Sequence, residues 1–597
     1  MIDITENHMA HISENSCCLR MKKIEGRLPD IIHGKIDPEP AVWVFILPYE
    51  PSKPFLEEST RWAASILNFA NNCHEKSLFC IMTAPATAAS LWPMMEHSLH
   101  YHLWITIKLS HIIEEKETFS NQHAALLILT RDKGSLRHTK TRISYTYCPY
   151  CDRTSKDYGG KKHTYHEYGT LISDVWRDIT CNPAEYPSDV ITRLSDLFGL
   201  QPYKALYTID FRKTATSNRV SYSQLNNLHI KRSETPEIAK RQTLILGDSL
   251  EVMKTLPSES IDFCFADPPY NLKKKYDSWD DALEIREYFL WCDKWLNELA
   301  RVLKPGRTLA VLNIPQWAIR HFGHLSTLLV FQNWIVWEGL GLPVRMIMPA
   351  NYSIVCFSKG RPRDLPGKRQ NIESADKREL ESIQESYCIR ASCVRGRRLA
   401  GICDKVPITD LWWDIHRLKH NSRRADHPCQ LPPALMRRLI AMFAYPKECV
   451  LDPFNGVGTT TLAAEELDRS FIGIELSEKY HNIAKQRHEE IRKGLDPFRK
   501  RNCIPIAKNS PVPRLKKQKY AVPKKVLQLE IKRIASELGR IPTRAEVASI
   551  SKYPKAYFDD YFISWGEACA AARTTGMSEI RTLKREGRMN RQLSLFK

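Results

Sequence analysis

Two strand-to-turn motifs constrain the fold of this chain more than any other feature. The first is the tetrapeptide Asp267–Tyr270 (Asp-Pro-Pro-Tyr), which follows the apolar run Ile261–Ala266. The second is Asp452–Thr460 (Asp-Pro-Phe-Asn-Gly-Val-Gly-Thr-Thr), which follows another short apolar run. Apolar runs of this length that end in Pro- or Gly-rich turns are typical of buried strands. The motifs therefore predict two strands whose ends carry functional loops.

Strands and helices are expected to alternate around these motifs. The hydrophobic pattern predicts strands at 243–246, 261–266 and 308–312, with helices at 250–255 and 282–303. Such alternation is typical of a parallel sheet covered by helices. The expected fold class is α/β, with a mostly parallel, Rossmann-like sheet.

The first motif suits a planar amine. Asp267 can accept one amine hydrogen, and the carbonyl of Pro268 can accept the other, because proline keeps its acceptor and fixes φ. Tyr270, after Pro269, offers a face on which an extruded base can stack. Contacts that strengthen as the amine becomes tetrahedral favour the transition state. An ordinary turn is the alternative for the tetrapeptide taken alone.

The second motif suits a bound cofactor. Gly456 and Gly458 allow the backbone to approach a ligand closely. Thr459 and Thr460 are expected to begin the next helix and to cap it. Glu475 ends the following predicted strand, at a spacing at which an acidic residue meets a ribose hydroxyl in dinucleotide folds.

Asp248 follows the first predicted strand and has two interpretations. It can accept a hydrogen bond from the adenine amine of a cofactor. It can also cap the helix that begins near Leu250. The sequence leaves both open.

The region from about residue 41 to residue 211 resembles a second copy of the same pattern. Four blocks recur in the same order, namely 41–49 with the run into 270, 124–131 with 352–359, 174–179 with 410–415, and 187–211 with 433–454. Ile46 or Leu47 falls where Asp267 stands, and Arg212-Lys213-Thr214 replaces the glycine turn. This copy is expected to keep the fold and to lose catalysis and cofactor. Two unrelated α/β domains are the alternative.

Residues 243–494 resemble the beta class of DNA amino-methyltransferases, in which the Asp-Pro-Pro-Tyr motif precedes the glycine-rich loop. The motifs occur in the order Gly247-Asp248-Ser249, Asp267–Tyr270, His427–Pro432, Asp452–Thr460 and Glu475. The resemblance implies a class I methyltransferase fold and S-adenosylmethionine as the cofactor. It implies methylation of N6 of adenine in double-stranded DNA after base flipping. N4 of cytosine, an RNA adenine and, in a different class, a non-catalytic DNA-binding scaffold are the alternatives.

The catalytic residues expected from motif and resemblance are Asp267, Pro268, Pro269 and Tyr270. The residues expected at the cofactor are Asp248, His427, Gln430, Asp452, Phe454, Asn455, Gly456, Gly458, Thr459, Thr460 and Glu475. By resemblance, residues 361–424 form the target-recognition region. Its basic residues suited to phosphate and guanine contacts are Lys368, Arg369, Arg395, Arg397, Arg398, Arg423 and Arg424. A solvated basic loop is the alternative for each.

A candidate zinc site lies in the first copy. Cys148 and Cys151 have Cys-x2-Cys spacing, and His163 and His166 follow them. The histidines are closer together than is usual for zinc, and the second copy, with two cysteines, has no matching pair of histidines. The alternative is a basic, glycine-hinged loop that touches DNA without metal.

Residues 526–576 resemble the helical repeat found beside homing endonucleases. The matching residues run from Ile534 to Thr543 and from Tyr561 to Cys569, and Thr543 is a plausible helix N-cap. The implied role is DNA binding, with a helical cap on the main body as the alternative. A nuclease is not favoured, because no His-Asn-His or metal-carboxylate cluster stands beside the repeat.

The charge of the chain indicates a polyanionic partner. Lys and Arg number 88 against 68 Asp and Glu, which gives a net charge of +20. No signal peptide and no apolar run long enough to span a bilayer is seen, and the 17 cysteines are scattered. These features predict a cytoplasmic protein without a membrane partner, nucleoid-associated if bacterial. The family resemblance and the repeat together imply a homodimer or an intramolecular pseudo-dimer.

The expected organisation has six parts. They are an N-terminal segment (1–40), a degenerate methyltransferase-like lobe (41–235), a catalytic domain (236–494), a basic linker (495–525), a helical repeat (526–576) and a basic tail (577–597).

Overall fold

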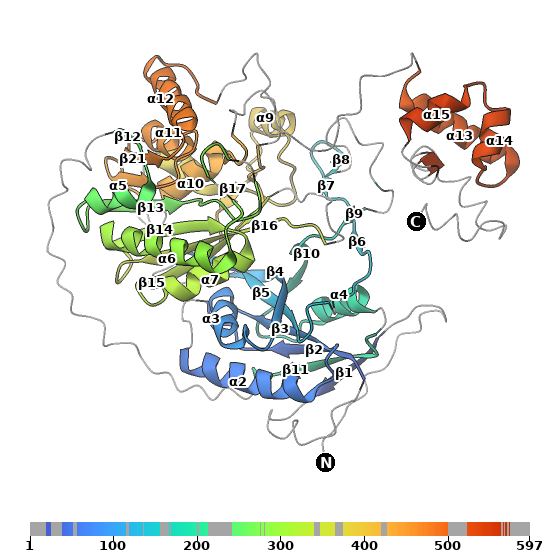
Figure 1. Ribbon diagram of the computed structural model, residues 1–597, viewed down its shortest axis with the longest axis horizontal. Helices are drawn as coiled ribbons and strands as arrows, with labels where there is room; N and C mark the ends of the chain where they lie inside the picture. Colours follow the sequence, from blue (N-terminus) through green and yellow to red (C-terminus); the bar gives the residue numbers. More distant parts are fainter. Residues whose placement is uncertain are drawn as a thin grey trace. The chain divides into compact units, whose positions relative to one another are not determined.

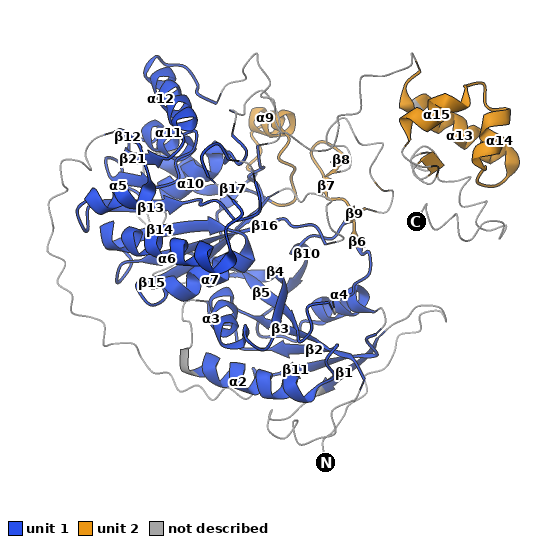
Figure 2. Cartoon of the chain, in the orientation of Figure 1, with its two compact units in different colours: residues 1–141, 171–384, 404–507 blue, residues 142–170, 385–403, 508–597 orange. Residues whose placement is uncertain are grey.

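The computed structural model divides into two compact units (Figures 1 and 2). Unit 1 comprises Met1–Thr141, Leu171–Gln384 and Asp404–Ala507, and unit 2 comprises Arg142–Thr170, Glu385–Cys403 and Lys508–Lys597. The structure describes residues 19–24, 39–51, 56–114, 119–134, 136–155, 166, 169–199, 202–212, 242–274, 276–279, 281–339, 347–364, 374–418, 425, 427–498, 522–562, 565, 568–569 and 572.

The first lobe of unit 1 is built on a sheet with the strand order β1-β11-β2-β3-β5-β4-β10. Its strands are β1 (Arg20–Ile24), β2 (Ala41–Ile46), β3 (Leu78–Thr83), β4 (His100–Ile113), β5 (Asn121–Thr130), β10 (Val175–Cys181) and β11 (Ala205–Asp210). Its helices are α2 (Leu56–Asn72), α3 (Pro85–Met95) and α4 (Ser188–Phe198). Strand β1 comes from the segment that was expected to precede the lobe.

The second lobe of unit 1 is built on a sheet with the order β12-β21-β20-β13-β14-β16-β15-β19. Its strands are β12 (Thr243–Leu246), β13 (Ile261–Ala266), β14 (Leu303–Asn313), β15 (Val330–Glu338), β16 (Asn351–Ser358), β19 (Leu411–Trp412), β20 (Cys449–Asp452) and β21 (Ser470–Glu475). A separate pair consists of β17 (Glu381–Ile383) and β18 (Lys405–Pro407). The helices are α5 (Ser249–Thr255), α6 (Ile285–Val302), α7 (Pro315–Leu325), α8 (Ser374–Glu379), α10 (Pro433–Phe443), α11 (Thr459–Glu466) and α12 (Glu478–Arg492).

The second lobe has three layers because β13 buries both of its faces. Cys264 and Ala266 pack with residues of α6 and α7, whereas Phe263 and Phe265 pack with residues of α10 and α11. Successive side chains of a strand point to opposite faces, so an uninterrupted apolar run requires cover on both sides. The expected α/β class is confirmed.

The two sheets of unit 1 share strand order and strand direction. Beginning at β1 in the first lobe and at β21 in the second, three parallel pairings are followed by two antiparallel ones and a final parallel one. A register shift after Tyr101 in β4 corresponds to a shift after Phe331 in β15. This agreement is what the repeated sequence blocks predict, and a common origin by duplication stays a prediction.

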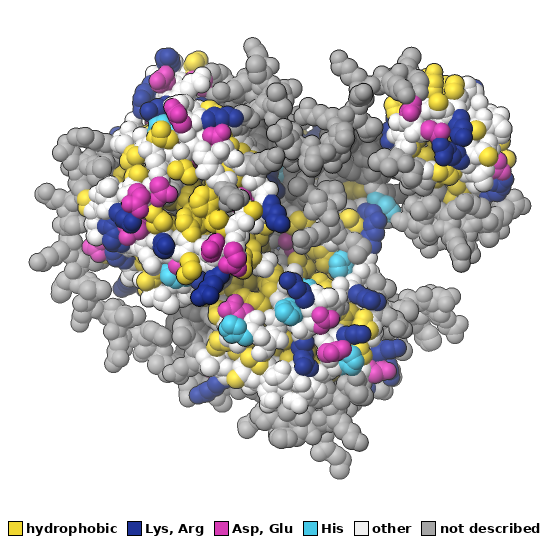
Figure 3. Space-filling model, in the orientation of Figure 1, with side chains coloured by type: hydrophobic (Ala, Val, Ile, Leu, Met, Phe, Trp, Pro, Cys, Tyr) yellow, Lys and Arg dark blue, Asp and Glu magenta, His cyan; other side chains and the backbone are white. Residues whose placement is uncertain are grey.

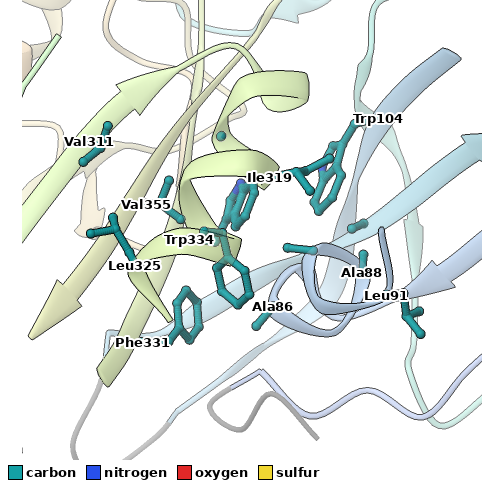
Figure 4. Close-up of a cluster of buried hydrophobic side chains, with 14 of the residues drawn as sticks. Ala86, Ala88, Leu91, Trp104, Val311, Ile319, Leu325, Phe331, Trp334 and Val355 are labelled. Carbon is teal, nitrogen blue, oxygen red and sulfur yellow. The ribbon is translucent and has the colours of Figure 1, made fainter. Parts of the chain in front are cut away.

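The lobes meet along a seam formed by the same elements of each. Helix α3 packs against α7, and Trp104 of β4 stacks on Trp334 of β15 (Figure 4). Both tryptophan side chains are buried. The apolar core is continuous across this seam, since residues of both lobes belong to one cluster.

Polar contacts cross the seam in both directions. Oδ1 of Asp174, in the first lobe, accepts hydrogen bonds from the backbone N–H groups of Ala350 (2.7 Å) and Asn351 (2.9 Å). In the opposite direction, Oδ1 of Asp410 accepts from the N–H of Gln122 (2.7 Å). Asp174 and Asp410 occupy matching positions in the repeated blocks, so the contact has approximate two-fold character.

Unit 2 contains short elements from separate stretches of the chain. They are β6 (Arg142–Ile143), β7 (Tyr147–Cys148), β8 (Arg153–Thr154), β9 (Thr170–Leu171, at the border with unit 1), α9 (Ala391–Leu399), α13 (Lys524–Leu538), α14 (Arg544–Ile550) and α15 (Lys555–Tyr561). The helices α13 to α15 have a small core that includes Val547, Phe558 and Phe562. Thr543 caps α14 in a capping box with Glu546, as the sequence predicts.

Among the described residues, no helix combines the length and the apolar character needed to cross a membrane.

Candidate active site

A pocket opens where four parallel strands of the second lobe end. Strands β12, β21, β20 and β13 are neighbours and run in the same direction. Their carboxyl ends are followed by Asp248, Leu476, Pro453 and Asp267, and all four line the pocket. Ligands of open α/β sheets bind at this edge.

The tetrapeptide is held rigidly at the pocket wall. The hydroxyl of Tyr270 donates to Oδ1 of Asp267 at 2.8 Å. Behind it, the hydroxyl of Tyr288 in α6 donates to the carbonyl of Pro269 (2.8 Å), and Nε1 of Trp317 in α7 donates to the carbonyl of Tyr270 (2.9 Å). Two helices therefore fix the backbone that carries the expected catalytic residues, and all four of these residues, Pro268 included, line the pocket.

The loop after the tetrapeptide is organised by Asp281, which the sequence analysis missed. Its carboxylate accepts hydrogen bonds from the backbone N–H groups of Asn271, Leu272 and Lys274, at 2.7 to 3.0 Å. Asn271 has a left-handed backbone with φ of 54°. The only signal in the sequence was an aspartate shortly after the tetrapeptide, and its distance from the tetrapeptide is not a fixed part of the motif.

Asp267 lies in an electrostatic environment suited to holding a proton. Burial raises the pKa of Asp267 to about 6, against the opposing effects of the Tyr270 hydrogen bond and the positive charges of Lys274 and Arg417. Lys274 lies 5.3 Å from the centre of the Tyr270 ring and donates to Sγ of Cys429 at 3.1 Å. A base that stacks on Tyr270 must share the ring with this ammonium group or displace it.

The glycine turn approaches Glu475 through its backbone. The N–H of Gly456 donates to Oε2 of Glu475 (2.7 Å), and the N–H of Ser477 donates to Oε1 (2.8 Å). Gly456 has φ of +52°, and a Cβ there would stand 3.2 Å from Nε2 of His427. Burial raises the pKa of Glu475. The turn therefore favours glycine through its backbone conformation, and a Cβ would also be tight against His427.

Several expected cofactor residues lie beneath the turn and do not line the pocket. Asp452 accepts from the N–H of Phe454 (2.9 Å), and burial raises the pKa of Asp452 to about 7. Asn455 accepts from the hydroxyl of Thr461 (3.1 Å). The buried residues absent from the pocket wall are Asp452, Asn455, Gly458, Thr459 and Thr460. Their geometry is that of a support for the turn.

The expected threonine cap of the next helix is wrong. Helix α11 begins at Thr459, and its N-cap is Gly458, whose φ is +83° and which cannot cap through a side chain. The threonines instead face inward and are buried, because the preceding turn carries them into the core.

His427 and Gln430 both line the pocket, as expected. The His427 ring packs edge-on against Tyr480, with ring centres 4.6 Å apart. Oε1 of Gln430 accepts from the N–H of Ala425 (2.7 Å). Nε2 of Gln430 is buried and has no hydrogen-bond acceptor among the described residues. A buried amide donor without an acceptor is unfavourable, and a polar ligand atom in contact with it would relieve that cost.

Asp248 is the N-cap of α5. Its Oδ1 accepts from the N–H groups of Leu250 (2.9 Å) and Glu251 (3.2 Å). It also lines the pocket. The capping interpretation is confirmed, and the cofactor contact stays a prediction.

The remaining pocket wall is largely aromatic and was not predicted. It includes Tyr276, Trp279, Trp291, Trp337, Tyr352 and Arg417. The rings of Trp337 and Tyr352 lie 5.2 Å apart, and Arg417 donates to the Tyr352 hydroxyl at 2.5 Å. Tyr276 and Trp279 follow the tetrapeptide closely, which was a usable signal, whereas Tyr352 and Arg417 are distant in sequence.

The structure corrects one residue of the expected target-recognition region. Arg395 and Arg398 are exposed on α9, but Arg397 is fully buried and donates to Sγ of Cys393 at 2.9 Å. Arg397 therefore makes a contact inside the protein and is not available to DNA, because successive residues of a helix point to different sides. The expected residues outside the described ranges are Lys368, Arg369, Arg423 and Arg424. On the face shown in Figure 3, basic side chains are interspersed with acidic ones.

The expected metal ligands are also corrected. Cys148 and Cys151 come together with Cys388 and Cys393, so two cysteines stand where two histidines were expected. His166 is not part of this group, and His163 lies outside the described residues. The second pair was missed because its members are far along the chain from the first.

Among its described residues, the first lobe lacks the groups that form the pocket of the second. Strand β2 ends at Ile46 and is followed by Leu47 and Pro48, without a carboxylate at these positions. Where the glycine turn would follow β11, the guanidinium of Arg212 donates to the carboxylate of Asp210 (2.6 Å) and to the carbonyl of Pro183 (2.8 Å). Arg212 therefore makes side-chain hydrogen bonds directly after β11, where the second lobe has its glycine turn.

The sequence comparisons agree with this geometry. Residues 261–486 match the family described as DNA methylase, and residues 522–572 match the family described as homing endonuclease associated repeat. The type II methyltransferase M.BamHI of Bacillus amyloliquefaciens is 35% identical over 265 residues, which are 43% of this chain and 60% of that protein. M.HpaI of Haemophilus parainfluenzae is 29% identical over 270 residues, 44% of this chain and 78% of that protein.

Among solved structures, the PvuII DNA methyltransferase (cytosine-N4-specific) is 21% identical with a TM-score of 0.29, covering 41% of this chain and 84% of that one. The complex of M1.HpyAVI with SAM is 20% identical with a TM-score of 0.29, covering 41% of this chain and 98% of that one.

The match to M.BamHI spans less than two thirds of that protein, and the DNA methylase match spans only the second lobe of this chain. Within that span lie the tetrapeptide, the glycine turn and most of the pocket wall, whereas Asp248 and Ser249 of that wall precede it. Residues 261–486 are therefore similar to the DNA methylase family in both sequence and site geometry, and the same chain carries a segment similar to the homing endonuclease associated repeat.

Proposed function

We propose that the chain transfers a methyl group from S-adenosylmethionine to N6 of an adenine that is flipped out of double-stranded DNA. One observation carries the proposal: the tetrapeptide that suits an exocyclic amine and the glycine turn that suits a cofactor open into the same pocket. Transfer requires the two reactants to be held side by side, and a shared pocket supplies that proximity.

The residues present fit the cofactor. A Cβ at Gly456 would make a tight contact of 3.2 Å with Nε2 of His427, and the φ of +52° also favours a residue without a side chain. Nε2 of Gln430 offers a buried donor, and Glu475 offers carboxylate oxygens toward a ribose. When bound, the cofactor supplies an electrophilic methyl carbon on a sulfonium.

The tetrapeptide would act on the amine. Tyr270 already donates to Oδ1 of Asp267, so Oδ2 is the oxygen assigned to one amine hydrogen, and the Pro268 carbonyl is assigned to the other. These contacts would direct the nitrogen lone pair at the methyl carbon as the carbon–sulfur bond breaks. The nitrogen then carries a proton that it must lose. Asp267, whose pKa burial raises to about 6, is placed to receive it.

Methyl transfer from labelled S-adenosylmethionine to duplex DNA tests the proposal, with the product nucleosides separated after digestion. N6-methyladenine is expected from the full chain. Asp267→Ala should abolish the product, and Glu251→Gln, which changes an exposed carboxylate of α5, should not. If the product is N4-methylcytosine, the proposed target base is wrong. If only RNA is methylated, the proposed substrate is wrong.

The first lobe would be a non-catalytic partner of the second. Its matching sheet, the two-way seam and the Arg212 side chain in place of a glycine turn support this part of the proposal. Calorimetric titration should give one S-adenosylmethionine per chain. Two equivalent sites would show that the first lobe has kept a functional pocket.

A further inference from the structure

Four cysteine side chains from two distant stretches of unit 2 gather at one point. The sulfur atoms of Cys148, Cys151, Cys388 and Cys393 all lie within 4.8 Å of one another. Sγ of Cys148 is 3.8 Å from Sγ of Cys393, and Sγ of Cys151 is 3.8 Å from Sγ of Cys388. All four are free cysteines.

These separations match a tetrahedral thiolate site. Zinc binds thiolate sulfur at about 2.3 Å, so the edge of a regular ZnS4 tetrahedron is about 3.8 Å. A disulfide would require the sulfurs to be about 2.0 Å apart. The four-sulfur arrangement is therefore that of a metal site.

The first cysteine pair lies on a hairpin suited to metal binding. Strands β7 and β8 pair antiparallel; Cys148 ends β7, and Cys151 lies in the turn that leads to β8. Asp152 follows with a left-handed φ of 49°, which allows the tight turn.

The second pair has a buried cation beside it. Cys393 lies in the first turn of α9, and Nη1 of Arg397, one turn later, donates to its sulfur at 2.9 Å. The Arg397 guanidinium also stacks over Tyr387 at 4.9 Å and is fully buried. Four thiolates around a divalent ion carry a net charge of −2, so a buried guanidinium beside them is the compensation such a site needs.

We propose that these four cysteines hold one structural zinc ion. The ligands come from the segment 142–170, between the first-lobe strands β5 and β10, and from the segment 385–403, between β17 and β18. One ion would thus join a stretch inserted in each lobe. No open coordination position remains, so the role is structural and not catalytic.

The site would determine the shape of the target-recognition region, an inference that rests on the proposed function. Helix α9 is anchored at Cys393 and presents Arg395 and Arg398 to solvent. Metal binding and local folding are coupled when ligands come from separate segments. The zinc ion would therefore hold these arginines in place for phosphate or guanine contacts.

Metal analysis of the full chain, purified without added metal, tests the assignment. One zinc per chain is expected, with release on titration of the thiols. Replacement by cobalt should give the absorption of a tetrahedral tetrathiolate. A chain with four freely reactive thiols here and no bound metal would overturn the assignment.

Variants locate the site and separate it from unfolding. Cys151→Ser and Cys388→Ser should each lose the zinc, whereas Cys403→Ser, which changes an exposed cysteine of the same segment, should keep it. Affinity for S-adenosylmethionine should persist in all three, because its pocket lies in unit 1. Retention of zinc by both Cys151→Ser and Cys388→Ser would exclude the proposed ligand set.

A DNA-binding measurement separates the metal from its role. Arg395→Ala with Arg398→Ala should weaken duplex binding at least tenfold while zinc content stays at one per chain. Unchanged binding would leave the metal site standing and refute the role given to α9. Neither result depends on methyl transfer, so failure of the proposed function would be seen separately.

Discussion

Trp104 of β4 lies face to face with Trp334 of β15, with ring centres 4.9 Å apart and ring planes 8° from parallel. The two residues belong to different lobes, and both are buried. They occupy matching positions, since each stands three residues after the residue at which its strand's register shifts. One side chain thus packs against its own counterpart, which is the arrangement found on the axis of a two-fold dimer.

We expect Trp104→Ala to loosen this seam. Truncation of a fully buried tryptophan lowers the free energy of unfolding by about 3–5 kcal/mol. Here the packing that is lost is the contact between the two lobes. Denaturant unfolding should show a lower midpoint, with separate transitions for the two lobes. Trp104→Phe keeps an aromatic ring and should lose much less. An unchanged midpoint in Trp104→Ala would mean that the seam contributes little to stability.

Replacement of Asp267 by Asn should abolish methyl transfer and stabilise the fold. Burial raises the pKa of Asp267 to about 6, so the folded state binds a proton more tightly than the unfolded state does. This favours folding below the unfolded pKa of about 4, and the benefit is lost as the pH rises to 6. At pH 8, Asp267→Asn should therefore increase the free energy of unfolding by on the order of 2 kcal/mol and raise Tm accordingly.

At pH 4 the same substitution should leave Tm unchanged, because Asp267 is then neutral. The pH profile of the unsubstituted chain follows from the same pKa. Methyl transfer should fall as the pH drops below about 6, since a protonated carboxyl loses the acceptor needed for the amine. Equal Tm for both chains at pH 8 would contradict the burial of a charged Asp267.

Gly456→Ala should weaken S-adenosylmethionine binding at least tenfold. The added Cβ would stand 3.2 Å from Nε2 of His427, and the φ of +52° disfavours any side chain. Gly134→Ala is the control, because a Cβ there meets nothing closer than 3.8 Å. Calorimetry should show reduced affinity for the first variant only. Equal affinity in both would remove the turn from the cofactor site.

Removal of residues 508–597 should weaken DNA binding and flatten its dependence on salt. For every phosphate of duplex DNA that the shortened chain no longer neutralises, the slope should fall by about 0.9 log units per decade of salt. Phe558→Ala is a matched variant, since it removes a buried side chain of the α13–α15 core while keeping every charge. A slope that falls in both variants would show that the folded repeat binds the phosphates.

A slope that falls only on truncation would assign phosphate binding to basic side chains that act without the folded repeat. If the truncated chain keeps both affinity and slope, the repeat has another role, such as a structural cap. Affinity for S-adenosylmethionine should survive in either variant, because its pocket is formed upstream.

The local part of this fold could be read from the sequence. The expected strand Ile261–Ala266 is β13 itself, and Thr543 caps α14 in the expected capping box. Helix α6 begins later than expected, at Ile285, because Glu284 caps it through the N–H groups of Arg286 and Glu287. Apolar runs and capping side chains act within a few residues, so a pattern in the sequence is sufficient to locate them.

The parts that were missed depend on contacts between distant residues. Cys148 and Cys393 approach only because two separate segments meet. The repeat placed Cys388 and Cys393 in the second copy, but it did not show that the two cysteine pairs come together. Arg397 looks like its exposed neighbours in sequence, and only the helix turn directs it inward. The pocket residues Tyr352 and Arg417 likewise reach the tetrapeptide through the tertiary fold.

The seam between the lobes has a consequence for how the molecule responds to dilution. Subunits of an ordinary dimer separate when their concentration falls below the dissociation constant. Here the counterpart of the methylase domain is part of the same polypeptide, so the second-order association is replaced by an intramolecular one. A cell that contains a handful of copies would still have every methylase domain paired, in a ratio set by translation and not by mass action.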